Sequence, residues 1–204
     1  ITKHYSVGYW KGGDQAVEEI LYTPKNIEKI LAWGGPSSMR QVRKYLVPGL
    51  DLIALDPKVS GSMIGPEAFS SQETLEYVAN QIAKDVGLLN QAACLNARVV
   101  YVECGTDASG LQKINRLGEL VHAAVQSLPS NLSSCSPEFP AKLREDIDAL
   151  RQSNSYRVIG VEHSEGGVIV SQQGKPVHFK DELNGRVVNL VPVDKIEQAL
   201  KWVT

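Results

Sequence analysis

Cysteine is the residue type in this sequence that most clearly offers covalent chemistry, because a thiolate is a strong nucleophile. The chain contains three cysteines, Cys94, Cys104 and Cys135. Their number is odd, their spacing matches no metal-ligand motif, and the N-terminus lacks the pattern of a secretory signal. This predicts free thiols in the cytoplasm and no metal site. On its own, each cysteine is more often a small buried residue than a nucleophile.

Cys94 differs from the other two in its surroundings. The stretch 88–96 carries it between a predicted helix and a predicted strand, with Asn90 and Gln91 shortly before it. A loop near helix ends and a cationic cofactor can favour the reactive thiolate. Such a position would allow Cys94 to act as a nucleophile, with its own backbone N–H as one donor to an oxyanion.

Two pairs of glycines could approach the phosphates of a cofactor. Gly12-Gly13 follows a predicted strand at residues 5–10 and precedes a helix that Asp14 can cap and that runs to about residue 21. Gly34-Gly35 follows a short strand within residues 27–33 and precedes a predicted helix at 39–46, and a third strand is predicted at 51–55. This alternation indicates parallel strands with helical crossovers. Such turns bind phosphate at helix N-termini, although most are plain connectors.

Two other groups of residues invite a chemical interpretation. His163 lies between Glu162 and Glu165, which would suit a metal or acid–base site, but a surface charge patch is several times more common. Trp10 and Trp33 stand at the ends of predicted strands. We expect both to form core beneath a cofactor rather than to stack on nucleic-acid bases.

The remaining elements must position the Cys94 loop. A capping box at 70–73 begins an amphipathic helix that ends at Gly87, and a strand at 98–103 follows the loop. Helices are predicted at 111–124 and 139–150, strands at 156–161, 168–171 and 186–193, and a final helix from 194. The chain starts at Ile1, directly before a predicted strand, so we expect a fragment.

Composition excludes several classes of protein. The chain has 204 residues, of which 43% are hydrophobic and 22% charged, as in ordinary soluble α/β proteins. A formal net charge of −2 and a pI of about 6.1 argue against a nucleic-acid partner. No apolar stretch approaches the ~20 residues of a membrane span.

Three motifs carry a resemblance to a known family. They are the stretches at 9–14 (YWKGGD), 30–35 (ILAWGG) and 90–94 (NQAAC), which are similar to those of the Lux-type fatty acyl-CoA reductases, a branch of the aldehyde dehydrogenase superfamily. The resemblance spans nearly the whole chain. It implies an α/β fold with two parts: residues 1–55, the incomplete second half of a parallel, Rossmann-like nucleotide-binding domain, and residues 56–204, a C-terminally truncated catalytic thiol domain.

The resemblance also implies roles for particular residues. Cys94 corresponds to the catalytic nucleophile, and Asn90 belongs to the same catalytic loop. The residues expected to contact the cofactor are Gly12, Gly13, Trp33, Gly34, Gly35 and Glu182. Glu182 corresponds to the glutamate that holds the nicotinamide ribose in the family segment Glu-x-Phe-Gly-Pro, although the Phe and Pro are absent here.

One departure from the superfamily affects the predicted reaction. Alignment on Lys58 places Ala54 where aldehyde dehydrogenases have the glutamate that activates a hydrolytic water. Without that base, an acyl-enzyme should react with a thiol or hydride rather than with water. We therefore expect reduction of a long-chain acyl-CoA to the fatty aldehyde with NADPH, through an acyl-enzyme on Cys94. Because Asp56 could supply the base if the register slips, an NAD-dependent aldehyde dehydrogenase is the alternative.

A non-catalytic acyl- or nucleotide-binding module of a multi-enzyme complex is the third alternative. The resemblance further implies that a transferase and a synthetase supply the acyl group, in the context of luminescence, and that the full-length protein is a homo-oligomer.

Overall fold

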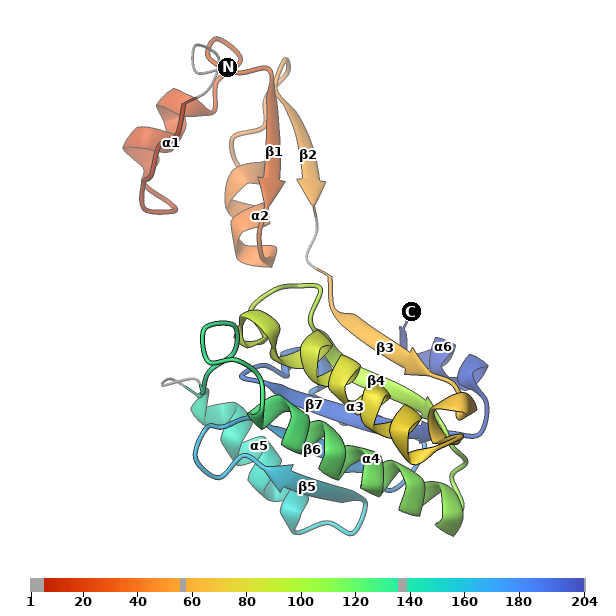
Figure 1. Cartoon of the computed structure of the whole chain (residues 1–204). Coiled ribbons are helices and arrows are strands. Elements are labelled where there is room, and N and C mark those ends of the chain that lie inside the picture. Colours follow the sequence, from red (N-terminus) through yellow and green to blue (C-terminus); the bar gives the residue numbers. More distant parts are fainter. Residues whose placement is uncertain (1–5, 56–57, 136–138, 204) are drawn as a thin grey trace. The chain divides into compact units, whose positions relative to one another are not determined.

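The structure is a computed structural model that describes residues 6–55, 58–135 and 139–203. The chain forms two compact units, Ile1–Lys58 (unit 1) and Val59–Thr204 (unit 2) (Figure 1). Both combine helices with parallel strands, as the sequence predicted. The functions of the two units, nucleotide binding and thiol chemistry, stay predictions.

Unit 1 contains one strand–helix–strand crossover preceded by a helix. Its elements are α1 (Gln15–Leu21), β1 (Lys29–Trp33), α2 (Pro36–Arg43) and β2 (Asp51–Leu55). β1 and β2 pair in parallel from Lys29↔Asp51 to Trp33↔Leu55. The side chain of Asp14 caps α1 by accepting the backbone N–H of Val17, as predicted. α2 begins earlier than predicted, because proline suits the first residue of a helix.

The predicted strand at 5–10 is wrong for the described residues 6–10, which have no regular secondary structure. Val7 and Tyr9 are 84% and 99% exposed. An extended segment becomes a strand only where a neighbouring strand pairs with its backbone, and within the described part of the chain β1 and β2 pair only with each other. The β-prone composition of this segment therefore does not determine its structure.

Unit 2 is built on a five-stranded sheet with the order β3-β4-β7-β6-β5. The strands are β3 (Ser60–Ile64), β4 (Ala97–Glu103), β5 (Tyr156–Gly160), β6 (Gly167–Ser171) and β7 (Val187–Val193). All neighbouring pairs are parallel except β5 with β6, which are antiparallel. The sequence did not predict β3, since Ser60, Gly61 and Ser62 lack the alternating apolar pattern of a strand, and pairing with β4 holds them extended.

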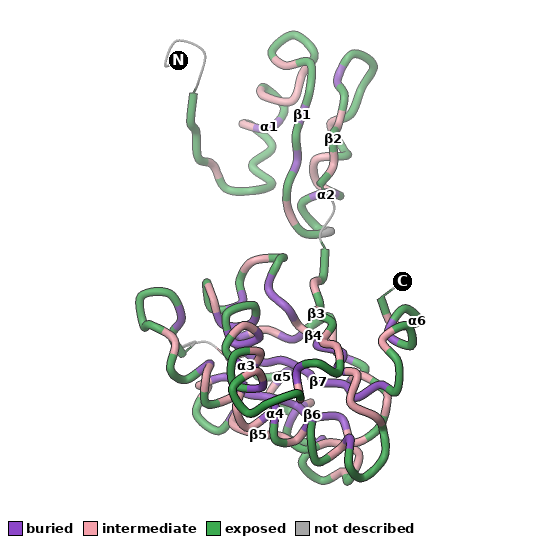
Figure 2. Tube along the Cα trace, turned by 45° about the vertical axis from the view of Figure 1, so that its right-hand side comes forward, coloured by how far each residue is buried: buried purple, intermediate pink, exposed green. Residues whose placement is uncertain are grey.

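Helices cover both faces of this sheet (Figure 1). The helical segments are η2 (Pro66–Phe69), α3 (Gln72–Gly87), η3 (Leu88–Gln91), α4 (Ala108–Gln126), α5 (Ala141–Arg151), η4 (Lys180–Glu182), η5 (Ile196–Ala199) and α6 (Leu200–Val203). α3 and α4 pack on one face, and α5, η5 and α6 contribute to cores on the other. β7 is buried along its whole length, and Figure 2 shows buried residues concentrated on the central strands.

Helix α3 begins one residue later than the predicted capping box. Ser71 is the N-cap, and its Oγ accepts the backbone N–H of Thr74 at 3.0 Å. Glu73 therefore occupies the second helical position and does not complete a capping box. The helix ends at Gly87 as predicted, so the Cys94 loop starts where expected. None of the described helices combines the length and the apolar character that crossing a bilayer would require.

We expect Leu190→Ala to lower the free energy of unfolding of the chain by about 2–5 kcal/mol, because Leu190 is fully buried in β7 and truncation leaves a cavity. Urea denaturation measures the change. Leu95→Ala is the control at a 69% exposed leucine and should change stability by less than about 0.5 kcal/mol. Equal effects of the two substitutions would contradict the burial of β7.

Candidate thiol site and cofactor pocket

Cys94 lies on the connection between η3 and β4, at the beginning of a central strand of unit 2, and it is exposed. The carbonyl oxygen of Cys94 accepts a hydrogen bond from Ser60 Oγ at 2.8 Å, which joins the loop to the start of β3. Among the described residues, the backbone N–H of Cys94 makes no hydrogen bond. The thiol is thus accessible, and a donor for an oxyanion is available beside it.

Gln91, three residues before Cys94, is buried and uses its whole side-chain amide. Nε2 donates to the carbonyl oxygens of Ala97 (2.9 Å) and Val187 (2.8 Å), and Oε1 accepts the N–H of Val187 (3.0 Å). These bonds join the loop to β4 and β7. Sequence analysis identified Gln91 only as part of a motif, whereas the structure shows that it anchors the loop.

Asn96, two residues after Cys94, is also buried and anchors the other end of the loop. Nδ2 donates to the carbonyl oxygens of Asp85 (2.9 Å) and Leu88 (3.0 Å) near the end of α3, and Oδ1 accepts the N–H of Ala93 (3.0 Å). Helix ends leave carbonyl groups without intrahelical partners, and this amide satisfies them. Sequence reasoning missed Asn96, because its only signal was an amide side chain directly before a predicted strand.

Asn90 is exposed and is bonded to another loop. Its Oδ1 accepts the N–H of Ser134 at 2.6 Å, and its Nδ2 donates to Ser134 Oγ at 3.3 Å. Leu89, Asn90 and Gln91 have φ angles of 55°, 55° and 61°, a left-handed run that is strained for non-glycine residues. These observed contacts of Asn90 hold the turn in place, and its predicted catalytic role stays a prediction.

Glu182 lies in η4, on the segment that leads into β7, and it is exposed. The neighbouring Asp181 is close enough to β4 to affect the pKa of Arg98 in that strand. Burial lowers the pKa of Arg98, and the negative charge of Asp181 opposes that shift. The η4 segment therefore lies beside the strand that follows the Cys94 loop. A role of Glu182 in holding a ribose stays a prediction.

Unit 1 contains a pocket of about 470 Å³ beside the first glycine pair. It is lined by Trp10, Gly12, Gly13, Glu18, Tyr22, Ser37, Ser38, Gln41 and Val42. Ser37 and Ser38 belong to the first turn of α2, directly after Gly34-Gly35. Backbone N–H groups of a helix N-terminus and a glycine turn are suited to phosphate oxygens. These residues therefore fit part of a dinucleotide.

A carboxylate that the sequence analysis missed organises this pocket. Glu18 is buried, Oε1 accepts the N–H of Gly13 at 2.8 Å, and Oε2 accepts from Gln41 Nε2 at 2.8 Å. The hydrogen bond from Gln41, followed by that from Gly13, lowers the pKa of Glu18. The ionised carboxylate thus joins the glycine turn to α2. Gly13 has a φ of 85°, which a residue with a side chain would adopt only with strain.

The predicted burial of the two tryptophans is wrong for Trp33. Its side chain is 78% exposed, because the burial pattern of β1 alternates and places Ile30 and Ala32 in the core instead. Trp10 is half-buried and meets the ring of Tyr22 edge-on, with centroids 6.5 Å apart. Contact of Trp33 with a cofactor stays a prediction.

The sequence comparisons identify the family. The family described as acyl-CoA reductase (LuxC) matches residues 1–204, the whole chain. The chain belongs to this family. A long-chain acyl-protein thioester reductase from Photorhabdus laumondii is 27% identical over 209 residues, and the match covers 100% of this chain but 39% of that protein. One of the same description from Aliivibrio fischeri is 29% identical over 102 residues, covering 50% of this chain and 20% of that protein.

Solved structures show that this LuxC-family chain has the aldehyde dehydrogenase-like fold predicted from sequence. NADP-dependent glyceraldehyde-3-phosphate dehydrogenase from Bacillus halodurans, complexed with NADP, matches with a TM-score of 0.63 and 13% identity, over 93% of this chain and 40% of that one. An NAD-dependent benzaldehyde dehydrogenase from Corynebacterium glutamicum matches with a TM-score of 0.62 and 13% identity, over 94% and 42%.

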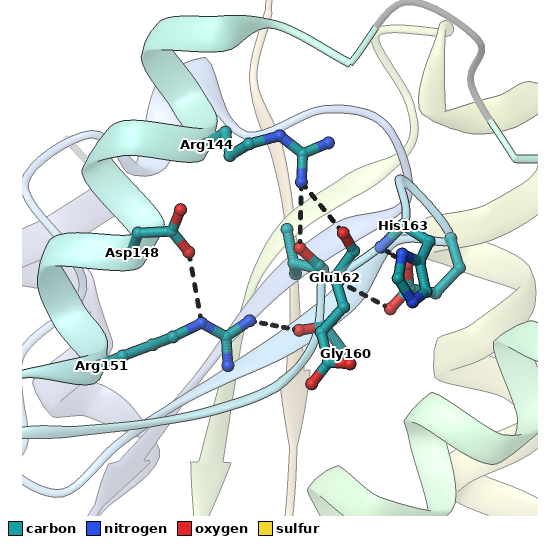
Figure 3. Close-up of polar contacts among 8 residues, drawn as sticks. Arg144, Asp148, Arg151, Gly160, Glu162 and His163 are labelled. Carbon is teal, nitrogen blue, oxygen red and sulfur yellow. Dashed lines mark hydrogen bonds and ion pairs between the residues drawn. The ribbon is translucent and has the colours of Figure 1, made fainter.

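The segment around His163 in this LuxC-family chain is a structured connection between β5 and β6 (Figure 3). The carboxylate of Glu165 accepts the backbone N–H groups of Glu162 (3.0 Å) and His163 (2.6 Å). Arg144 donates to the carbonyls of Val161 and Glu162, and Arg151 donates to that of Gly160 and pairs with Asp148. Within the described ranges, no group of three or more His, Cys, Asp or Glu residues could hold a metal ion.

Cys104, at the end of β4, lacks the properties of a nucleophile. Burial raises the pKa of the Cys104 thiol from 9.0 to about 12, so the thiol stays protonated at neutral pH. Burial, followed by the charge of Asp181, likewise raises the pKa of Tyr101 from 10.0 to about 12. Cys135 is exposed.

These two raised pKa values predict loss of stability in alkali. Between about pH 9 and 12 the unfolded chain releases protons that the folded chain retains, so the free energy of unfolding falls as the pH rises. Urea denaturation at pH 8 to 11 should show a shallower decline for the Cys104→Ala/Tyr101→Phe double variant. The exposed pair Cys135→Ala/Tyr77→Phe is the control and should leave the slope unchanged. If stability of the Cys104→Ala/Tyr101→Phe variant declines with pH as steeply as that of the wild type, the two raised pKa values are refuted.

Proposed function

We propose that this LuxC-family chain carries the acyl-transfer site of a long-chain acyl reductase, with Cys94 as the nucleophile and NADPH as the reductant. The observation that carries the proposal is the exposed Cys94 on a loop anchored on both sides by buried amides, with its backbone N–H available. Two relatives are long-chain acyl-protein thioester reductases, which supports the substrate class.

The chemistry follows from these groups. The thiolate of Cys94 attacks the carbonyl carbon of an acyl thioester, the N–H of Cys94 stabilises the oxyanion, and the donor thiol departs with a proton. NADPH, when bound, supplies a hydride that reduces the resulting acyl thioester on Cys94. Collapse of the hemithioacetal regenerates the thiol and releases the aldehyde. A solved neighbour that is complexed with NADP supports a dinucleotide of this kind.

Ala54 supports reduction over hydrolysis. Its methyl group packs against the unit 1 core formed by Ile30, Ala32, Met39 and Leu50, and it offers no base. Water must be activated before it attacks a thioester at an appreciable rate. The acyl-enzyme should therefore persist until hydride arrives, which distinguishes the proposed reductase from an aldehyde dehydrogenase.

The source of the acyl group and the setting are part of the same proposal. The donor is acyl-CoA or an acyl-protein thioester made by a transferase and synthetase, and the natural protein acts in the cytoplasm as a homo-oligomer. Gly12, Gly13, Gly34 and Gly35 would contact the cofactor phosphates, and Trp33 and Glu182 the remainder of the cofactor.

We expect labelled tetradecanoyl-CoA to acylate the natural protein at Cys94, since this thiol is exposed and its loop is fixed. Peptide mapping by mass spectrometry identifies the site. Cys94→Ser should abolish the label, and Cys135→Ser, at an exposed cysteine outside the loop, should retain it. Label that persists in the Cys94→Ser variant would remove the basis of the proposal, and a non-catalytic binding module would then be the better interpretation.

We expect the preformed acyl-enzyme to yield aldehyde with NADPH faster than it yields free fatty acid without it, because Ala54 provides no base for water. Chromatography of the two products measures the ratio. A predominance of fatty acid in the presence of NADPH would favour the aldehyde dehydrogenase alternative.

A further inference from the structure

Two central strands of unit 2 separate at the end that carries the thiol loop. β4 and β7 pair in parallel from Val99↔Asn189 to Glu103↔Val193. Continuing this register towards the N-terminal ends would place Ala97 opposite Val187, but these residues do not pair with each other. The side-chain amide of Gln91 lies between them and bonds to both. The Gln91 amide thus takes the place of one pair of residues in the hydrogen-bond ladder between β4 and β7.

This arrangement makes Gln91 a link between the loop and the sheet interior. Gln91 is 1% exposed and bonds both the N–H and the C=O of Val187, the first residue of the fully buried strand β7. Among the described residues, no other side chain of the loop at 88–96 bonds to β7. The other anchors reach different elements, since Asn96 bonds to the end of α3 and Ser60 joins the loop to β3.

The two chemical steps of the proposed reaction differ in what they demand of this loop. Acyl transfer needs an exposed thiol, which Cys94 offers. Hydride transfer needs the thioester carbon held at a fixed place and angle, and a displacement of about 1 Å can lower such a rate about 100-fold. An anchor to a fully buried strand therefore matters more to the second step than to the first.

We infer that Gln91 is a positioning residue that couples the Cys94 loop to β7 and holds the acylated cysteine for reduction. The inference rests on the proposed function. Loss of the amide separates the two steps: acyl transfer to Cys94 continues, and reduction of the acyl-enzyme slows. Loss of the Asn96 amide loosens the loop from α3 and leaves its bonds to β7 in place.

The test compares Gln91→Met with Asn96→Leu in the natural protein. Each substitution removes the three bonds of one buried amide in the same loop while keeping a side chain of similar length. Single-turnover measurements give the rate of Cys94 acylation by tetradecanoyl-CoA and the rate of aldehyde formation from the preformed acyl-enzyme with NADPH. We expect Gln91→Met to change acylation less than about 3-fold and to slow reduction about 100-fold. Asn96→Leu should change the two rates by similar factors.

Hydrogen exchange supplies a readout that does not depend on turnover. In Gln91→Met the peptides covering 88–96 and 185–190 should both exchange faster, because Val187 loses the acceptor of its N–H. In Asn96→Leu only the peptide covering 88–96 should do so. If Gln91→Met fails to fold, Gln91→Glu, which keeps an oxygen for the N–H of Val187, replaces it, and slower reduction at retained acylation is again expected.

The outcomes separate this inference from the proposed function. Equal slowing of both steps by Gln91→Met, or no slowing of reduction, would overturn the positioning role while Cys94 is still acylated in the wild type. Failure of the wild-type protein to be acylated at Cys94 would overturn the proposed function itself.

Discussion

The thiol site depends on one constraint: a backbone that turns sharply inside a protein must still satisfy its buried hydrogen-bonding groups. A buried donor or acceptor without a partner costs about 1–3 kcal/mol. Around Cys94, the side-chain amides of Gln91 and Asn96 meet this requirement for the starts of β4 and β7 and for the end of α3. Each amide donates twice and accepts once, so the loop has a defined conformation although Cys94 itself is exposed.

The sheet explains why this loop can be rigid. β7 is buried on both faces and lies between β4 and β6, with α3 and α4 on one side and α5, η5 and α6 contributing to the other. Parallel strands covered on both faces need near-continuous apolar sequence, and the valines and leucine of β7 provide it. The hydrogen bonds that anchor the loop to this strand hold the loop in one conformation. They offset the backbone strain of the three left-handed residues at 89–91.

In unit 1 a charged carboxylate anchors the glycine turn, whereas in unit 2 side-chain amides anchor the Cys94 loop. The carboxylate of Glu18 accepts one hydrogen bond from Gly13 and one from Gln41, and these bonds connect the glycine turn to α2. The pocket beside them has the glycines and helix N-terminus suited to phosphate. In both units, a buried polar side chain supports a loop with a proposed function without itself being a candidate for the chemistry.

The sequence by itself determined the local elements. Asp14 marks the start of α1. The apolar repeat from Leu75 to Val86 identifies α3, and Gly87 marks its end. The β-branched run before Glu103 defines β4, so the sequence places the Cys94 loop correctly between α3 and β4. The motifs at 9–14, 30–35 and 90–94 also indicated the family and the fold. The signals for the helices, strands and turns act over a few residues, through caps, periodicity and turn chemistry, and can be read without the rest of the chain. The family was indicated by resemblance alone.

Only the tertiary structure decided which segments find a partner. Residues 6–10 are β-prone but belong to no strand, whereas Ser60–Ile64 has little β pattern and becomes one through pairing with β4. Trp33 is exposed because the alternation of β1 places its neighbours in the core. Gln91 anchors the thiol loop through Val187, which is 96 residues away in sequence. Backbone pairing and buried amide bonds depend on groups that the fold brings together, so no local pattern could have revealed them.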